Sequence, residues 1–362
     1  MRGEGAPPTR AEGDLLASYL HTQAAEFLRA LRRHRESSDA TDQDRSARST
    51  LDMRRSARRI GGALHTFRPL TDRGWADPLR AELAWLSGTL AREHAYTERL
   101  ERLLDALQRL GAPTVLPTAR GNGALPPRET ASAQTPAQAS AQAPPQASAQ
   151  ATAQAPSQAS APAPSHEAAL GIARAGALLE RQLTLARTRA HSAALQALGS
   201  SRFHAIADAV ALLASDAPVE PGDPAPYAAL AEHRLTEAVA ALPLGRAARP
   251  YNSEAVHEGQ DSPWHQVRLL LRLHRYAQEV TGRDTTALAE ASRTLDLHRD
   301  AAEAASAAAA SARTARIAPA TAYALGVLHS EQRHEVEAAR FAFQRQWRRT
   351  VEATETTGVV RG

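Results

Sequence analysis

A long uncharged segment near the middle of the chain sets the first limit on the fold. From about Gly111 to Ser165 the sequence becomes rich in Ala, Gln, Pro and Ser, and Thr130 to Ser165 carries no charge. Such a composition buries too little apolar surface to offset the entropy of ordering, and its prolines interrupt helices. We therefore expect a disordered linker at residues 111–166. It separates a first helical half, residues 10–110, from the remaining helices at residues 167–352.

The sequence on both sides of this segment has the periodicity of amphipathic helices. Leu16, Leu20, Phe27 and Leu31, for example, recur at spacings of four or seven residues. Aromatic residues make up only 4% of the chain, and its abundant Ala, Leu, Arg and Glu favour helices, so we predict an all-α fold. Residues 245–261 are expected to form a loop. The expected helices span residues 14–35, 45–70, 75–91, 93–110, 166–198, 201–215, 228–242, 263–280, 285–314 and 319–352; the third and fourth are compatible with one bent helix.

Two residue types are absent from the sequence, and each absence excludes several kinds of chemistry. Without Cys there is no disulfide, thiol nucleophile or Cys-ligated metal site. Without Lys there is no Schiff base and no phosphate-loop lysine. An anion site in this chain must therefore use Arg, His, backbone N–H groups or helix N-termini.

Two segments of the chain align with each other. Residues 51–61 match residues 265–275, so that Arg54 falls on Arg268 and Arg58 on Arg272. Each segment is preceded by one predicted helix and followed by a longer one. A repeat of about 200 residues is typical of a duplicated helical unit rather than a solenoid. We therefore expect two antiparallel helical bundles that are related by a pseudo-twofold axis.

The aligned segments carry stripes of basic residues. His265, Arg268, Arg272 and Arg275 fall within roughly 80° of one another on a helix. Like charges on one face repel each other, so acidic neighbours or a bound polyanion must neutralise them. The first copy has a shorter stripe, Arg54 and Arg58, with Arg59 beside it. We expect both stripes to face one cavity.

The order of these motifs resembles the CHAD domain, the conserved-histidine α-helical domain. The second stripe matches the family pattern His-x-x-Arg-x-x-x-Arg-x-x-Arg. Further segments in the same order as in the family are Leu64–Phe67, Leu79–Leu86, Leu295–Asp300 and Tyr323–Leu328, with Trp347 downstream. The first half is a degenerate copy, because Leu51 and Gly61 stand where the family pattern has histidine and a basic residue. The segment Ala91 to Ala95 lacks the expected Arg-Asp, and position 296 is Asp where Gly is usual.

The resemblance implies a fold and a ligand. It implies two four-helix bundles with a basic channel between them, and it implies binding of inorganic polyphosphate and association with polyphosphate granules. Bidentate contacts between Arg and phosphate oxygens are compatible with this ligand. Since the second stripe keeps more basic residues, we expect it to dominate binding. The resulting set of polyphosphate-binding residues is Arg54, Arg58, Arg59, His265, Arg268, Arg272, Arg275 and His298.

Other interpretations stay open at this stage. The stripes could be solvated faces, His298 could be a core histidine, and His265 could orient the stripe rather than touch a ligand. A helical scaffold or adaptor that has lost ligand binding and a non-specific nucleic-acid binder are the alternative functions, although few aromatics are available for base stacking.

We expect no enzyme activity, cofactor or metal site, since no catalytic constellation or metal-ligand spacing is present. The absence of a run of about 20 apolar residues argues against a membrane span, so a cytoplasmic location is expected.

Overall fold

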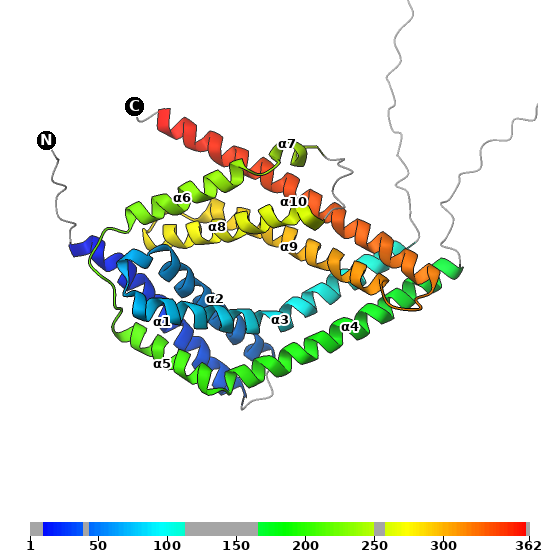
Figure 1. The fold of residues 1–362 in the computed structure, drawn as a ribbon, viewed down its shortest axis with the longest axis horizontal. Helices are drawn as coiled ribbons and strands as arrows, with labels where there is room; N and C mark the ends of the chain where they lie inside the picture. Colours follow the sequence, from blue (N-terminus) through cyan, green and yellow to red (C-terminus); the bar gives the residue numbers. More distant parts are fainter. Residues whose placement is uncertain (1–9, 39–42, 113–165, 250–257, 360–362) are drawn as a thin grey trace, which may run out of the picture.

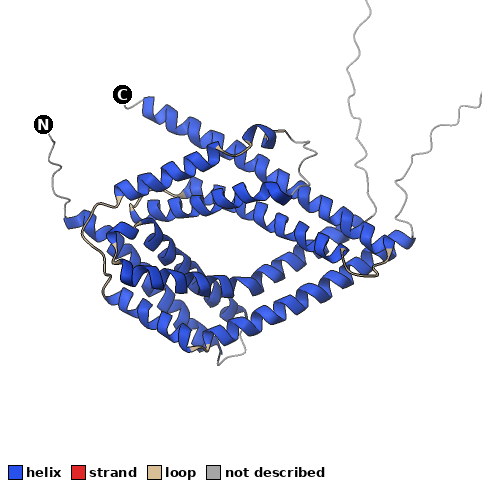
Figure 2. Ribbon diagram, viewed as in Figure 1, coloured by secondary structure: helices blue, strands red, loops and turns tan. Residues whose placement is uncertain are grey.

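The computed structural model describes residues 10–38, 43–112, 166–249 and 258–359, and this part of the chain is almost entirely helical (Figure 2). The expected linker lies outside the described residues, except at its two ends. No described helix is long and apolar enough to cross a lipid bilayer. The elements are α1 (Arg10–Ser38), α2 (Gln43–Thr66), η1 (Arg68–Leu70), α3 (Arg73–Gly111), α4 (His166–Leu198), α5 (Ser201–Ser215), α6 (Ala225–Ala240), α7 (Leu244–Ala247), η3 (Glu258–Gln260), α8 (Asp261–Val280), α9 (Thr286–Ala312) and α10 (Pro319–Val359).

The all-α prediction is confirmed, and one local expectation is corrected. Helix α3 is a single helix, which agrees with one of the two arrangements expected for residues 75–110. The expected loop at residues 245–261 contains most of the one-turn helix α7, the η3 turn and the start of α8. Single helical turns are too short to show a periodic pattern, which explains why sequence reading missed them.

Side-chain caps fix where two of the helices begin. The carboxylate of Asp72 accepts a hydrogen bond from the backbone N–H of Gly74 at 2.7 Å and so starts α3. The hydroxyl of Ser200 accepts one from the N–H of Phe203 at 3.2 Å and starts α5. Each cap satisfies a backbone donor that has no partner inside the helix.

Buried apolar residues form three large clusters. The first joins α1, α2, α5 and the first half of α3, and includes Phe27 and Phe67. The second joins the C-terminal parts of α3 and α9 to the N-terminal parts of α4 and α10 through small residues and leucines such as Ala175 and Leu325. The third joins α6, α8, α9 and α10 around Trp264 and Phe343. Helices α4 and α5 therefore pack with the first three helices although they follow the long segment.

The long helices connect these clusters and enclose the centre of the molecule. Figure 1 shows α2 and α3 on one side of this centre and α8 and α9 on the other. Helices α3 and α9 approach each other again near the second cluster, where Arg99 forms an ion pair with Glu303. The polar side chains of α2, α3, α8 and α9 that are not in the clusters can therefore meet at the centre.

Candidate functional site

Helices α2 and α8 cross at very short range. A Cβ atom on Gly62 of α2 would lie 2.5 Å from Cδ2 of the Tyr276 ring of α8, so a side chain at this position would collide with the ring. Arg58 of α2 and Arg272 of α8 each precede this crossing by about one helical turn, and the next arginine of each stripe precedes it by two. The crossing therefore brings the two stripes together.

Five guanidinium groups meet near this crossing, and we call them the inner arginine cluster: Arg54, Arg58, Arg268, Arg272 and Arg299. Burial lowers the pKa of Arg54, and repulsion from Arg299 and Arg272 lowers it further. Burial is also the largest cause of the lowered pKa of Arg58, Arg268 and Arg272, and in each case other members of the cluster add to it. The cluster is thus a set of half-buried like charges that repel one another.

Three of the five groups have no ion-pair partner. Among the described residues, Arg54, Arg58 and Arg272 have no hydrogen-bond or ion-pair partner, and the Nε atoms of Arg54 and Arg58 are buried without an acceptor. An arginine does not lose its proton in a protein, so these groups remain charged. Desolvating an unpaired charge is costly, and a bound anion would relieve that cost.

The other two members of the cluster do contact carboxylates. Arg268 donates from Nη1 to Oδ1 of Asp296 at 2.7 Å, and Arg299 donates from Nε to Oδ1 of Asp300 at 2.8 Å. Burial opposes the charge on Arg299, but Asp300 and Asp296 raise its pKa overall. The cluster still contains more positive than negative charge.

A cavity of about 300 Å³ opens beside the cluster. Both stripes contribute to its wall, because Arg54 of α2 and Arg268 of α8 both line it. Helices α3 and α9 supply most of the rest. The charged and titratable lining residues are Arg54, Arg92, His94, Tyr96, Glu98, Arg99, Arg268, Arg299 and Glu303.

Two predicted site residues, Arg59 and Arg275, are neutralised inside the protein by Glu279 of α8. Arg59 donates from Nε to Oε2 of Glu279 at 3.0 Å, and Tyr19 donates to the same oxygen at 2.8 Å. The Nε atom of Arg275 lies 3.6 Å from Oε1. These contacts tie α1 and α2 to the end of α8.

The two predicted histidines differ in accessibility. The side chain of His298 is 1% exposed, and its Nε2 accepts a hydrogen bond from Nε of Arg340 at 3.2 Å. Burial, followed by repulsion from Arg340, lowers the pKa of His298 to about 2, so this imidazole is neutral. His265 is half-buried, its ring meets that of His298 edge-to-face at 5.5 Å, and burial lowers its pKa. His298 is therefore enclosed by protein, whereas His265 lies one turn from Arg268.

A buried ion network fixes the start of α8 to α10. Asp261 accepts from Nη1 and Nη2 of Arg333 at 2.7 and 3.0 Å and also from Arg340. Arg340 donates in addition to Glu337 at 2.6 Å. The side chains of Arg333 and Arg340 are 1% and 4% exposed. Here each buried cation has a carboxylate partner.

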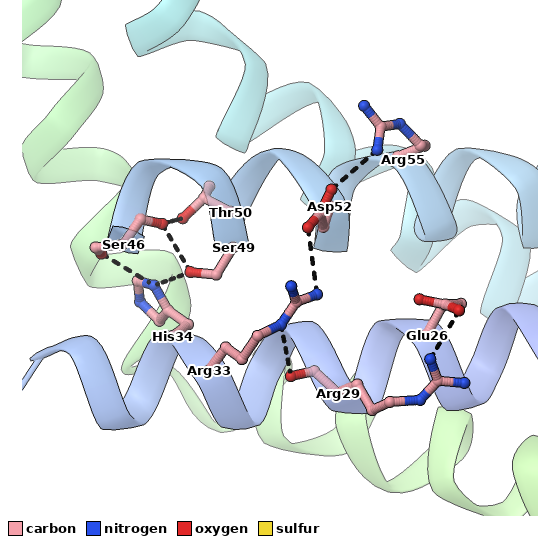
Figure 3. A network of polar contacts seen from close by, with 9 residues as sticks. All are labelled: Glu26, Arg29, Arg33, His34, Ser46, Ser49, Thr50, Asp52 and Arg55. Carbon is pink, nitrogen blue, oxygen red and sulfur yellow. Dashed lines mark hydrogen bonds and ion pairs between the residues drawn. The ribbon is translucent and has the colours of Figure 1, made fainter. Parts of the chain in front are cut away.

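Paired arginines also lie on the outer faces of α1 and α2. Figure 3 shows Arg55 and Arg33 on the two oxygens of Asp52, at 2.9 and 3.2 Å. The side chain of Arg55 is 58% exposed. Arg54, the preceding residue in sequence, points to the inner cluster and has no such partner.

Sequence reading did not select several residues of the site. Arg299 lies in the segment Leu295–Asp300 but was not chosen, although it directly follows His298 in the sequence. The contacts of Asp296 with Arg268 and of Glu279 with Arg59 join positions whose proximity only the fold reveals.

Together the fold and the site define an all-helical protein with an internal basic cavity. The family model of the CHAD domain matches residues 22–291. The chain therefore belongs to the CHAD domain family, which confirms the resemblance inferred from its motifs. No curated protein matches the chain significantly. A solved structure, PptA from Streptomyces chartreusis, is similar at 51% sequence identity and a TM-score of 0.70, over 93% of this chain and 99% of that chain.

Proposed function

We propose that this protein binds inorganic polyphosphate through the inner arginine cluster. One observation carries the proposal: Arg54, Arg58 and Arg272 are half-buried, mutually repelling and without a hydrogen-bond or ion-pair partner among the described residues. A polyanion would supply that partner. Membership of the CHAD family supports the same ligand.

A linear phosphate polymer fits the chemistry of the cavity. Arg forks bind phosphate oxygens in pairs, and arginines from α2, α8 and α9 offer several forks around one space. Polyphosphate has no sequence to read, so it needs no base-stacking or base-reading device. We assign ligand contact to the five members of the inner cluster, with His265 beside them. Arg59, Arg275 and His298 then have structural roles.

The duplicated architecture is part of this proposal. Residues 53, 57 and 63 of α2 are buried, as are residues 267, 271 and 277 of α8, and both sets follow the register that aligns Arg54 with Arg268. Gly62 and Tyr276, which approach each other closely at the crossing, are also equivalent positions in this register. Equivalent helices of two pseudo-twofold-related units would place their stripes face to face. In this account the protein is a binding protein at polyphosphate granules rather than an enzyme.

Calorimetric titration with long-chain polyphosphate at several salt concentrations tests this function. We expect binding that weakens as salt rises, because bound counterions are released. Single-stranded RNA of equal total charge is the comparison ligand. Stronger binding of RNA would favour the nucleic-acid alternative, and no binding of either polymer would favour a scaffold without a ligand.

A matched pair of double variants localises the site. Arg58→Gln with Arg272→Gln removes two unpaired charges, whereas Arg33→Gln with Arg55→Gln removes two paired charges from the outer face. Charge-assisted contacts contribute about 1.5–3 kcal/mol each, so the first pair should weaken binding about 100-fold or more. The second pair should change it less than about threefold, as expected for exposed charges. Equal losses of affinity in the two double variants would show that binding depends only on the net charge of the protein.

A further inference from the structure

Asp296 of α9 is a carboxylate placed among the guanidinium groups of the inner cluster. Its Oδ1 lies 2.7 Å from Nη1 of Arg268 and 3.9 Å from Nη1 of Arg299. The side chain of Asp296 is 45% exposed, whereas those of Arg268 and Arg299 are 18% and 21% exposed. The carboxylate therefore lies on the solvent side of its partners and has room to move.

The charge of Asp296 reaches the whole cluster. Attraction to this carboxylate raises the pKa of each of the five arginines, against the effect of burial. The other nearby carboxylates act on fewer members: Glu98 on Arg54, and Asp300 and Glu303 on Arg299. Asp296 is thus the shared counter-charge of the cluster.

A phosphate chain and this carboxylate compete for the same donors. A phosphate that binds Arg268 must replace the hydrogen bond from Arg268 to Asp296. Any phosphate near Arg54, Arg58 or Arg272 is also repelled by the carboxylate. An anion that only replaces Asp296 at Arg268 gains little binding free energy there. A chain that also reaches the three unpaired arginines gains binding free energy from each of them.

We propose that Asp296 acts as an internal counter-anion that opposes the binding of phosphate anions. It neutralises the inner cluster in the ligand-free protein, it is displaced from Arg268 by polyphosphate, and it keeps short phosphate anions from binding well. This inference rests on the proposed function and adds the residue that opposes binding.

Asp296→Asn tests the inference because affinity and stability should change in opposite directions. The variant loses the counter-charge, so its thermal midpoint without ligand should fall. Its affinity for long-chain polyphosphate should rise about tenfold, the equivalent of one regained charge-assisted contact. Triphosphate, the short probe, should bind more tightly by a similar factor and become a measurable ligand. A purely structural role for Asp296 predicts that stability and affinity fall together, and that result would overturn the proposal.

Asp77→Asn is the matched control. Asp77 also pairs with two arginines, Arg68 at 2.6 Å and Arg80 at 3.6 Å, and its substitution makes the same change in net charge. We expect less than a twofold change in affinity. An equal gain in both variants would reduce the effect to net charge and overturn the role of Asp296. If wild-type protein binds no polyphosphate, the proposed function fails; if it binds and Asp296→Asn is unchanged or weaker, only this inference fails.

Discussion

Helix α8 borders two groups of buried or half-buried arginines that differ in their counter-charges. At its start, Arg333 and Arg340 lie in the buried ion network and share Asp261, with Glu337 as a further acceptor. Further along the same helix lies the inner arginine cluster, in which Arg272 has no partner among the described residues. Burial alone does not distinguish the two groups, because the arginines of both are shielded from solvent.

The difference indicates which arginines serve the fold and which are available to a ligand. A buried cation with a carboxylate partner is satisfied within the protein and holds helices in place. A half-buried cation without a carboxylate partner raises the free energy of the ligand-free protein. Binding of an anion to this cation lowers the free energy again. The same criterion separates Arg59, which Glu279 neutralises, from its neighbour Arg58.

Removing the shared carboxylate of the buried ion network should have the largest effect. Asp261→Asn removes the carboxylate that Arg333 and Arg340 share, and breaking a buried pair commonly costs about 3–5 kcal/mol. Denaturant unfolding should show a loss of this size. Glu337→Gln, which removes a carboxylate that contacts only Arg340 of these two arginines, should cost less. Equal, small losses in both variants would contradict the structural role assigned to this network.

The two stripes can be compared by removing each in turn. The sequence favoured the second stripe, but Arg268 already contacts Asp296 whereas Arg54 and Arg58 are unpaired. We therefore expect Arg54→Gln with Arg58→Gln to weaken polyphosphate binding at least as much as Arg268→Gln with Arg272→Gln. Each loss should be about 100-fold in calorimetric titration, at about 1.5 kcal/mol per contact. A loss confined to the second pair would restore the asymmetry that the sequence suggested.

The buried histidine predicts how stability depends on pH. Because the pKa of His298 is about 2 in the folded protein and about 6.5 when unfolded, the unfolded state binds more protons below pH 6.5. The contribution of His298 to stability is therefore complete above pH 6.5 and is lost as pH falls, by up to about 1.4 kcal/mol per pH unit. His298→Gln should flatten the dependence of unfolding free energy on pH between 5 and 7. An unchanged slope would show that His298 does not titrate on unfolding.

The smallest expected effect has the opposite sign from ordinary core damage. Arg272→Met removes an unpaired charge but keeps most of the aliphatic side chain, so it relieves desolvation and repulsion. Without ligand, its unfolding free energy should stay equal to that of the wild type or rise by up to about 1 kcal/mol. A loss of more than that would mean that Arg272 contributes to the fold.

Sequence reading predicted the parts of the molecule that depend on local periodicity. Nine of the described helices follow hydrophobic spacing closely enough that most of their bounds were expected within a few residues. The stripe at His265 to Arg275 follows from helical geometry alone. The resemblance to the CHAD family came from the order of short motifs.

The partners of these arginines could not be predicted, because they are distant in sequence. Arg59 and Glu279 are 220 positions apart, and Asp261 and Arg340 are 79 apart. Spacing on one helix gives the direction of a side chain but not the charge that it will meet. Arg59 and His298 were selected for this reason, although the fold neutralises or encloses them, whereas the partner of Arg275 is Glu279, four residues along the same helix.

The crystal structure of this protein with a linear polyphosphate bound tests the central claim most directly. We predict phosphate oxygens within hydrogen-bond distance of Arg54, Arg58 and Arg272, with Arg268 released from Asp296. Arg59 and Arg275 should remain on Glu279, and Arg33 and Arg55 on Asp52. Polyphosphate bound to the outer face at Arg33 and Arg55, with the inner cluster unoccupied, would contradict the account.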